Sequence, residues 1–188
     1  MCRHLEEGLA FHCAPALAGI KPANLISCAK ADCPNFAALV EEYNQALNSR
    51  DIYFQVLSQL ERSYLLLVYR RRQLSAQLER PEIAQLLSEA GYPTGCPLAA
   101  QLERLGRRLA EQKEGFPHEI GLFLGYPPED VTGFLRHGGK NCLLCGHWKV
   151  YAHPEQAREL FRRYDKCRDA LCRRVALGMS ISQLFQAA

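Results

Sequence analysis

The sequence predicts an α+β fold in a single domain, residues 1–188, with a mixed sheet of four or five strands, flanking helices and a long C-terminal helix. Strand and helix patterns alternate along the chain, which is typical of a sheet covered by helices. Two of the strand patterns follow one another across a short polar stretch, which indicates a hairpin. No internal repeat or low-complexity linker divides the chain, so one domain is expected.

In the first half of the chain, residues 14–20 are small and apolar, which fits a short helix or a tight loop. Residues 24–28 read as a short strand. Residues 36–47 carry apolar side chains at helical spacing and predict an amphipathic helix. Residues 52–59 alternate, and residues 64–69 are apolar throughout, so we expect a hairpin whose second strand is buried on both faces.

In the second half, proline and glycine mark where several elements begin and end. Helices are expected between Pro81 and Gly91, along residues 98–109, between Pro127 and Gly138, and from Pro154 to Gly178 with a further turn at 181–185. Gly106 interrupts the leucine face of the second of these helices, at a cost of about 1 kcal/mol. Strands are expected at residues 117–126 and 148–151.

Composition and charge exclude several classes of protein. Apolar residues make up 48% and charged residues 23% of the chain, which excludes disorder, collagen and coiled coil as the main state. The net charge of +3 is too small to indicate nucleic acid or an anionic membrane as a partner. The first residues lack a signal-peptide core, and the longest strongly apolar run spans only residues 65–69. We therefore expect a cytoplasmic, soluble protein.

The sequence contains nine cysteines, an odd and high number. Disulfides are rare in a reducing cytosol, so metal binding, thiol chemistry and simple burial are the alternatives. Cys142 and Cys145 form a Cys-x-x-Cys pattern in a glycine-rich turn. Such a pair ligates zinc or iron, with His147 or His153 as further ligands, or forms a redox pair that meets a redox partner protein. Inert, buried or exposed thiols are the simpler interpretation.

Cys13 is the candidate nucleophile. It precedes the small-residue segment, and a helix starting there would lower the pKa of its thiol. Lys21, Asn24 and Ser27 follow closely and could bind an anion or an oxyanion. The adjacent His12 is badly placed as a base for Cys13, although it could contribute to ligand binding. The simpler interpretation is that Cys13 fills a small space in the core.

His118, with Glu119 beside it, is the better remote base for Cys13. Arg70, at the end of a predicted strand, could hold a phosphate or a carboxylate, and Lys149 is a further candidate for ligand binding. Most other arginines belong to solvated, ion-paired helix faces. No phosphate-binding loop, dinucleotide fingerprint or hydrolase signature is present.

Two stretches of the sequence carry a resemblance to a known family. They are residues 12–25, HCAPALAGIKPANL, and residues 116–127, FPHEIGLFLGYP, the latter followed by EDV at 129–131 and GHWKVY at 146–151. Over the whole chain, the sequence resembles a bacterial family, domain of unknown function 3793. His147 stands where tyrosine is expected, and Ala16 where threonine is expected. The resemblance implies a redox or iron context, because genes of this family often lie near flavodoxin-like genes. It assigns no activity and no catalytic residue.

Two functions are therefore expected. The first is a small-molecule-binding or thiol-dependent enzyme-like domain with a cleft around Cys13, Lys21, Asn24 and His118. The second is a metal- or redox-linked accessory module that uses the turn containing Cys142.

Overall fold

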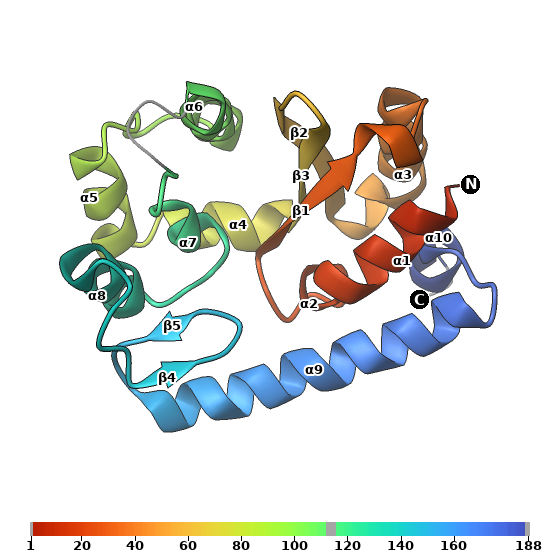
Figure 1. The fold of residues 1–188 in the computed structure, drawn as a ribbon. Coiled ribbons are helices and arrows are strands. Elements are labelled where there is room, and N and C mark those ends of the chain that lie inside the picture. The colour runs from red at the N-terminus through yellow and green to blue at the C-terminus, as the bar shows by residue number, and fades with distance from the viewer. Residues whose placement is uncertain (1, 112–115, 187–188) are drawn as a thin grey trace.

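The computed structural model describes residues 2–111 and 116–186 (Figure 1). Its centre is a three-stranded antiparallel sheet of β1 (Ala23–Ala29), β2 (Ile52–Gln59) and β3 (Ser63–Arg70), in the order β1-β3-β2. The strands β2 and β3 form the predicted hairpin. Because β3 lies between the other two strands, its middle is buried on both faces, as expected from its unbroken apolar run.

Helices surround the sheet on both sides. They are α1 (Arg3–His12), α2 (Ala14–Leu17), α3 (Phe36–Leu47), α4 (Arg71–Leu78), α5 (Pro81–Glu89), α6 (Leu98–Glu111), α7 (Ile120–Phe123), α8 (Pro128–His137), α9 (Pro154–Ala176) and α10 (Ile181–Gln186), with 3₁₀ turns η1 (Lys30–Asp32) and η2 (Asn48–Arg50). Within the described residues, no helix is both long and apolar enough to cross a bilayer.

The alternation of side chains along β1 separates two hydrophobic cores. Ile26 and Cys28 point to the first face of the sheet, where they pack with α1, α2, α3 and α10. Ala23 and Leu25 point to the second face, where they pack with α4 to α8. In Figure 1 these two groups of helices lie on opposite sides of the sheet.

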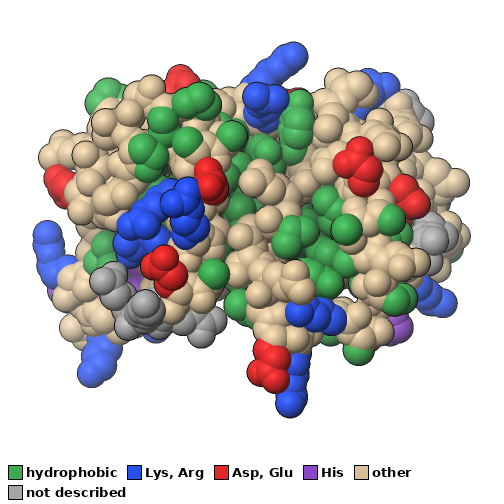
Figure 2. All heavy atoms as spheres, turned by 90° about the horizontal axis from the view of Figure 1, so that it is seen from above, with side chains coloured by type: hydrophobic (Ala, Val, Ile, Leu, Met, Phe, Trp, Pro, Cys, Tyr) green, Lys and Arg blue, Asp and Glu red, His purple; other side chains and the backbone are tan. Residues whose placement is uncertain are grey.

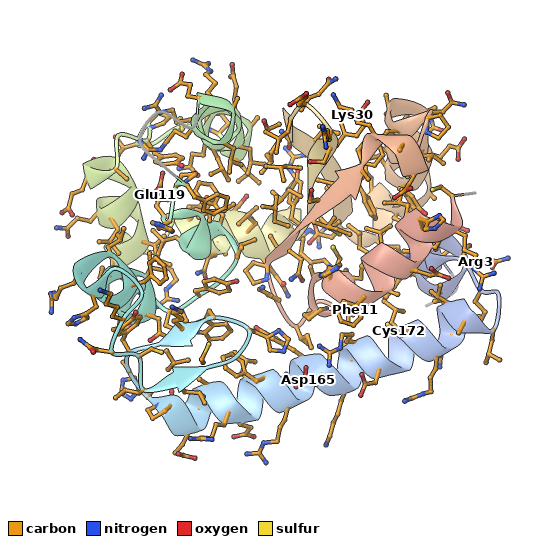
Figure 3. The ribbon with its side chains drawn as sticks, viewed as in Figure 1. Arg3, Phe11, Lys30, Glu119, Asp165 and Cys172 are labelled. Atoms are coloured by element: carbon orange, nitrogen blue, oxygen red, sulfur yellow. The ribbon has the colours of Figure 1, made fainter. Side chains whose placement is uncertain are left out.

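A second, smaller sheet lies apart from the first. β4 (Leu144–Cys145) and β5 (Lys149–Val150) pair antiparallel as a short ribbon. Trp148 and Val150 from this ribbon pack against Phe161 and Tyr164 of α9. The 23-residue helix α9 then runs from the ribbon to α1 (Figure 1). Figure 3 shows Phe11 and Cys172 where α1 and α9 lie side by side.

The α+β class, the hairpin and the long C-terminal helix are confirmed, but two details of the predicted sheet are wrong. The central sheet has three antiparallel strands rather than four or five strands in a mixed arrangement, because β1 and β2 both pair antiparallel with β3 and the ribbon strands pair only with each other. The expected strand over residues 117–126 is instead a loop and the single helical turn α7. This turn buries Ile120, Leu122 and Phe123 in the second-face core, which an apolar run achieves equally well as helix or strand.

Gly106 is needed for packing, although a glycine inside a helix lowers the stability of that helix. A Cβ at this position would collide with the backbone carbonyl oxygen of Leu57 in β2. The glycine therefore allows α6 to approach the edge strand of the sheet. Seen from above, Lys and Arg side chains lie at several separate places with acidic side chains between them (Figure 2), so this surface carries mixed charge.

Candidate functional site

A pocket of about 420 Å³ lies beside the second face of the sheet, between α7, α8 and the β4–β5 ribbon. Its lining is mostly apolar and aromatic: Leu25, Phe116, His118, Ile120, Gly121, Leu124, Tyr126, Asp130, Val131, Phe134, His147, Trp148 and Lys149. We call it the aromatic pocket. Ligand sites of proteins typically have this character, with an apolar lining and a few polar groups that fix orientation.

Stacked rings build one wall of the aromatic pocket. Tyr126 stacks on Trp148 with 4.8 Å between ring centroids, and Phe161 meets the indole edge-on at 4.5 Å. Gly121 lies against this wall, since a Cβ there would come within 2.9 Å of Tyr126 and Val131. The wall is therefore held on several sides before any ligand enters.

Asp130 fixes the orientation of the indole. One carboxylate oxygen accepts a hydrogen bond from Trp148 Nε1 at 2.7 Å, and the other accepts from the backbone N–H groups of Tyr151 and Ala152 at 2.6 and 3.0 Å. The Asp130 side chain is buried, so these three donors satisfy a carboxylate that has little water around it. Asp130 thereby joins α8 to the ribbon.

His118 and Lys149 stand near the same ring, Phe134. The His118 ring centroid is 4.6 Å from that of Phe134, and the Lys149 ammonium is 5.9 Å from the Phe134 centroid. Lys149 Nζ also donates a hydrogen bond to the carbonyl oxygen of Gly139 at 2.6 Å. Both side chains belong to residues that are exposed, so they can meet a molecule entering from solvent.

His147 lines the pocket from the ribbon side and is held by α9. Its Nε2 lies 3.1 Å from a carboxylate oxygen of Asp165, and its ring contacts Phe161 and Tyr164. Cys142 is half-buried and Cys145 is exposed. Over residues 2–111 and 116–186, no three His, Cys, Asp or Glu side chains converge as they would around a metal ion. Zinc or iron at the Cys-x-x-Cys turn stays a prediction.

The structure does not bring Cys13 and His118 together. Cys13 is fully buried between α1 and α2 in the first-face core, whereas His118 lines the aromatic pocket together with Leu25 of the second face. Burial raises the pKa of Cys13, and the Cys28 thiol adds to the effect, while Lys21 opposes it. The expected lowering of this pKa by a helix end is outweighed, because α2 is a single turn and the thiol has lost its water.

Glu119, predicted as a partner of His118, contacts two other elements of the fold. Its carboxylate lies 2.6 Å from Arg108 Nε and accepts a hydrogen bond from the Tyr92 hydroxyl at 3.0 Å. These contacts join α7 to α6 and to the loop that follows α5. In Figure 3, Glu119 lies among these helices, far across the sheet from Phe11 of α1.

Arg70 and Asn24 connect α2 to the central sheet. The Arg70 guanidinium donates to the carbonyl oxygens of Ala16, Leu17 and Arg50, and Asn24 Oδ1 accepts from the backbone N–H of Ala16. Their hydrogen-bonding groups are therefore directed at backbone. His12 and Ser27, both exposed, line a separate pocket of about 130 Å³ near the first face.

Lys21 is a buried amine without a salt bridge or hydrogen bond to any described residue. Its ammonium lies 5.0 Å from the centroid of the Tyr126 ring and 5.8 Å from that of Tyr164. Burial lowers the pKa of Lys21 to about 8, against a smaller opposite effect of Cys13. The two tyrosine faces compensate part of the lost hydration.

The sequence pointed to His118, Lys149 and His147 but not to the three aromatic residues and the aspartate that connect them. Tyr126, Asp130, Phe134 and Trp148 come from a loop, a helix and a ribbon that only the folded chain brings together. The one available signal was that Trp148, the single tryptophan of the chain, lies between His147 and Lys149.

Fold and site together define an α+β protein with an aromatic ligand-sized pocket beside a three-stranded antiparallel sheet. The chain belongs to the family described as "Protein of unknown function (DUF3793)", whose model matches residues 9–185. No curated protein and no solved structure matches the chain. The family resemblance that residues 12–25 and 116–127 indicated is thus confirmed.

Proposed function

We propose that this protein binds a small molecule in the aromatic pocket, with a flat apolar body against the aromatic wall and an anionic group near Lys149 and His118. The observation that carries the proposal is the position of these two side chains beside the same ring, Phe134. The proposed binding site is therefore the aromatic pocket at the second face, and not a cleft around Cys13.

The size and lining of the pocket support an apolar body. A volume of about 420 Å³ lies within the range of small-molecule sites. Tyr126 and Trp148 are already stacked and held by neighbours, so binding would cost little ordering of these side chains. Flat apolar molecules gain most from such preformed aromatic walls.

The polar groups support an anionic end. Lys149 uses one of its three N–H groups on Gly139, and the carbonyl there keeps the ammonium beside Phe134. The Asp130 carboxylate, in contrast, is turned toward three N–H donors of the protein itself. A carboxylate or phosphate would therefore meet Lys149 rather than Asp130.

Calorimetric titration with a matched pair of probes tests the proposal. We expect 2-naphthoate to bind with one site per chain and its neutral analogue 2-naphthamide to bind more weakly. Lys149→Met should weaken 2-naphthoate about tenfold, the loss of one charge-assisted hydrogen bond, and leave 2-naphthamide unchanged. Lys140→Met, an exposed lysine outside the pocket lining, is the control and should change neither affinity.

Two outcomes contradict the proposal. One is the absence of saturable binding by either probe. The other is an equal loss of affinity for both probes in Lys149→Met, which would mean that the lysine supports the shape of the pocket and does not meet the anion.

A further inference from the structure

Six of the nine cysteines pack in or against the first-face core, and four of these lie in the first 33 residues; the other two, Cys167 and Cys172, belong to α9. Cys13, Cys28 and Cys33 are buried in the first-face core, and Cys2 packs against it partly exposed. The aromatic pocket uses none of these thiols. Sequence spacing did not single out the group of four, because its members are distributed over the first 33 residues.

Cys2 and Cys33 are in direct contact. Their sulfur atoms lie 3.0 Å apart, joined by a hydrogen bond in which either thiol can donate. This separation exceeds the length of a disulfide bond by only about 1 Å. In the part of the chain that the structure describes, it is the one pair of cysteines joined in this way.

The fold holds both residues of the pair in place. Cys2 is the N-cap residue of α1, and its thiol also lies 3.1 Å from the carbonyl oxygen of Asp32. Cys33 directly follows η1, and its backbone N–H donates to the carbonyl of Lys30. Two backbone segments far apart in sequence therefore present their sulfurs to each other without rearrangement.

We infer that Cys2 and Cys33 form a thiol–disulfide exchange site, which a small disulfide such as oxidised glutathione converts to an intramolecular disulfide. The Cys2 sulfur attacks one sulfur of the small disulfide, breaks its S–S bond and releases one thiol. The Cys33 sulfur, giving up its proton, then attacks the Cys2 sulfur and breaks the mixed disulfide, and the second small thiolate leaves and takes up a proton to become a thiol. Two protein thiols are oxidised and one small disulfide is reduced to two thiols.

The burial of the two thiols sets the order of these steps. Cys2 is the partly exposed member of the pair, so the small disulfide reaches it first. Cys33 is only 3% exposed, and burial together with the hydrogen bond to Cys2 raises its pKa to about 12. Cys33 keeps its proton at neutral pH, which makes it the slower, resolving thiol.

The disulfide would join the start of α1 to the connection between β1 and α3. It would close a loop across a sequence separation of 31 residues, which restricts the unfolded chain and stabilises the fold. We therefore expect oxidation to raise the midpoint of thermal unfolding, and dithiothreitol to return it to the reduced value.

The test treats the reduced full-length chain with oxidised glutathione under native conditions and follows its intact mass. We expect no glutathione retained on Cys2 or Cys33, and a non-reduced proteolytic peptide, two hydrogen masses lighter than its two reduced parts, that links Cys2 to Cys33. Cys33→Ser should stop at one glutathione bound to Cys2, because the resolving thiol is gone. Cys145→Ser, at an exposed thiol, is the control and should still form the link.

Cys2→Ser provides a second variant if Cys33→Ser does not fold, and it should form no intramolecular disulfide involving Cys33. The inference is overturned if the first disulfide of the native protein joins Cys142 to Cys145. It is also overturned if the unaltered protein keeps glutathione on Cys2, or if the link forms only after denaturation.

Discussion

The two faces of the central sheet are packed in different ways. On the first face, α1, α2, α3 and α10 enclose the core, and the carboxylate of Glu6 is buried there: it accepts hydrogen bonds from Tyr43 and from the backbone of Ile181. On the second face, α7, α8 and the ribbon leave the aromatic pocket, with His118 and Lys149 at exposed positions.

This difference shows why a reactive-looking sequence pattern is not a reactive site. Cys13 has the neighbours that would activate a thiol, but full burial raises its pKa. The described residues that line the cavity around His118 include no cysteine, but this cavity is large enough for a ligand. The second face is therefore the side on which to look for binding.

The largest expected effect comes from the carboxylate that holds the pocket together. Asp130→Ala would leave one buried and two part-buried N–H donors without their acceptor, so we expect the free energy of unfolding to fall by about 3–5 kcal/mol. Urea denaturation measures this loss. A decrease below about 0.5 kcal/mol, as for ordinary surface substitutions, would contradict the assigned role.

Glu6 is the matching carboxylate of the first face. Glu6→Ala would remove the acceptor of two donors, Tyr43 and Ile181, and we expect a loss of about 2–4 kcal/mol. It should leave binding of 2-naphthoate unchanged in the folded protein. Glu7→Ala, exposed on the same helix, is the control. A change of binding in Glu6→Ala would mean that the two faces are not independent.

Burial of the Lys21 amine near both cores lowers the stability of the fold, and this effect depends on pH. Its pKa falls from 10.5 in the unfolded chain to about 8 in the folded protein, so between these pH values the unfolded chain binds more protons. The contribution of Lys21 to unfolding free energy therefore rises with pH across this window, and below it the cost of burial is present in full.

Lys21→Met removes that cost. We expect the variant to be more stable than the unaltered protein by about 1–3 kcal/mol at pH 7, with the advantage shrinking toward pH 10.5. Tyrosines and cysteines that titrate in the same range are common to both proteins and cancel in the difference. Urea denaturation at several pH values measures the difference in unfolding free energy between the two proteins. A difference that does not change with pH would contradict the account.

Gly106→Ala gives the smallest effect, with a sign that separates packing from helix propensity. Propensity alone predicts a gain of about 1 kcal/mol. The collision of the new Cβ with the Leu57 carbonyl predicts a net loss of about 1–2 kcal/mol instead. Ala99→Gly, exposed on the same helix, measures propensity without this contact. A more stable Gly106→Ala protein would show that α6 does not pack closely on β2.

Elements with a clear period were predictable from the sequence. The helix over residues 36–47, the β2–β3 hairpin and the long helix α9 follow directly from their apolar spacing. The structure of residues 117–126 was not predictable, because their apolar residues follow neither the helical nor the strand period. Tertiary contacts of Glu119 with Arg108 and Tyr92, which local sequence does not reveal, accompany the helical turn.

The candidate site was predictable only in its chemistry-bearing residues. His118 and Lys149 were identified from residue type, but their common neighbour Phe134 depends on how α8 packs against the ribbon. The contact between Cys2 and Cys33 joins residues whose sequence separation is 31, with no motif to indicate it. Such sites arise from tertiary packing, which local patterns do not encode.

The most direct test of the account observes Trp148 itself. It is the single tryptophan of the chain, so its indole N–H gives one resolved signal in a ¹H–¹⁵N correlation spectrum. Because this N–H is bonded to Asp130 in the pocket wall, titration with 2-naphthoate should shift the signal saturably, with the affinity that calorimetry gives. An indole signal that stays in place while 2-naphthoate binds would show that binding occurs elsewhere and contradict the assignment of the aromatic pocket.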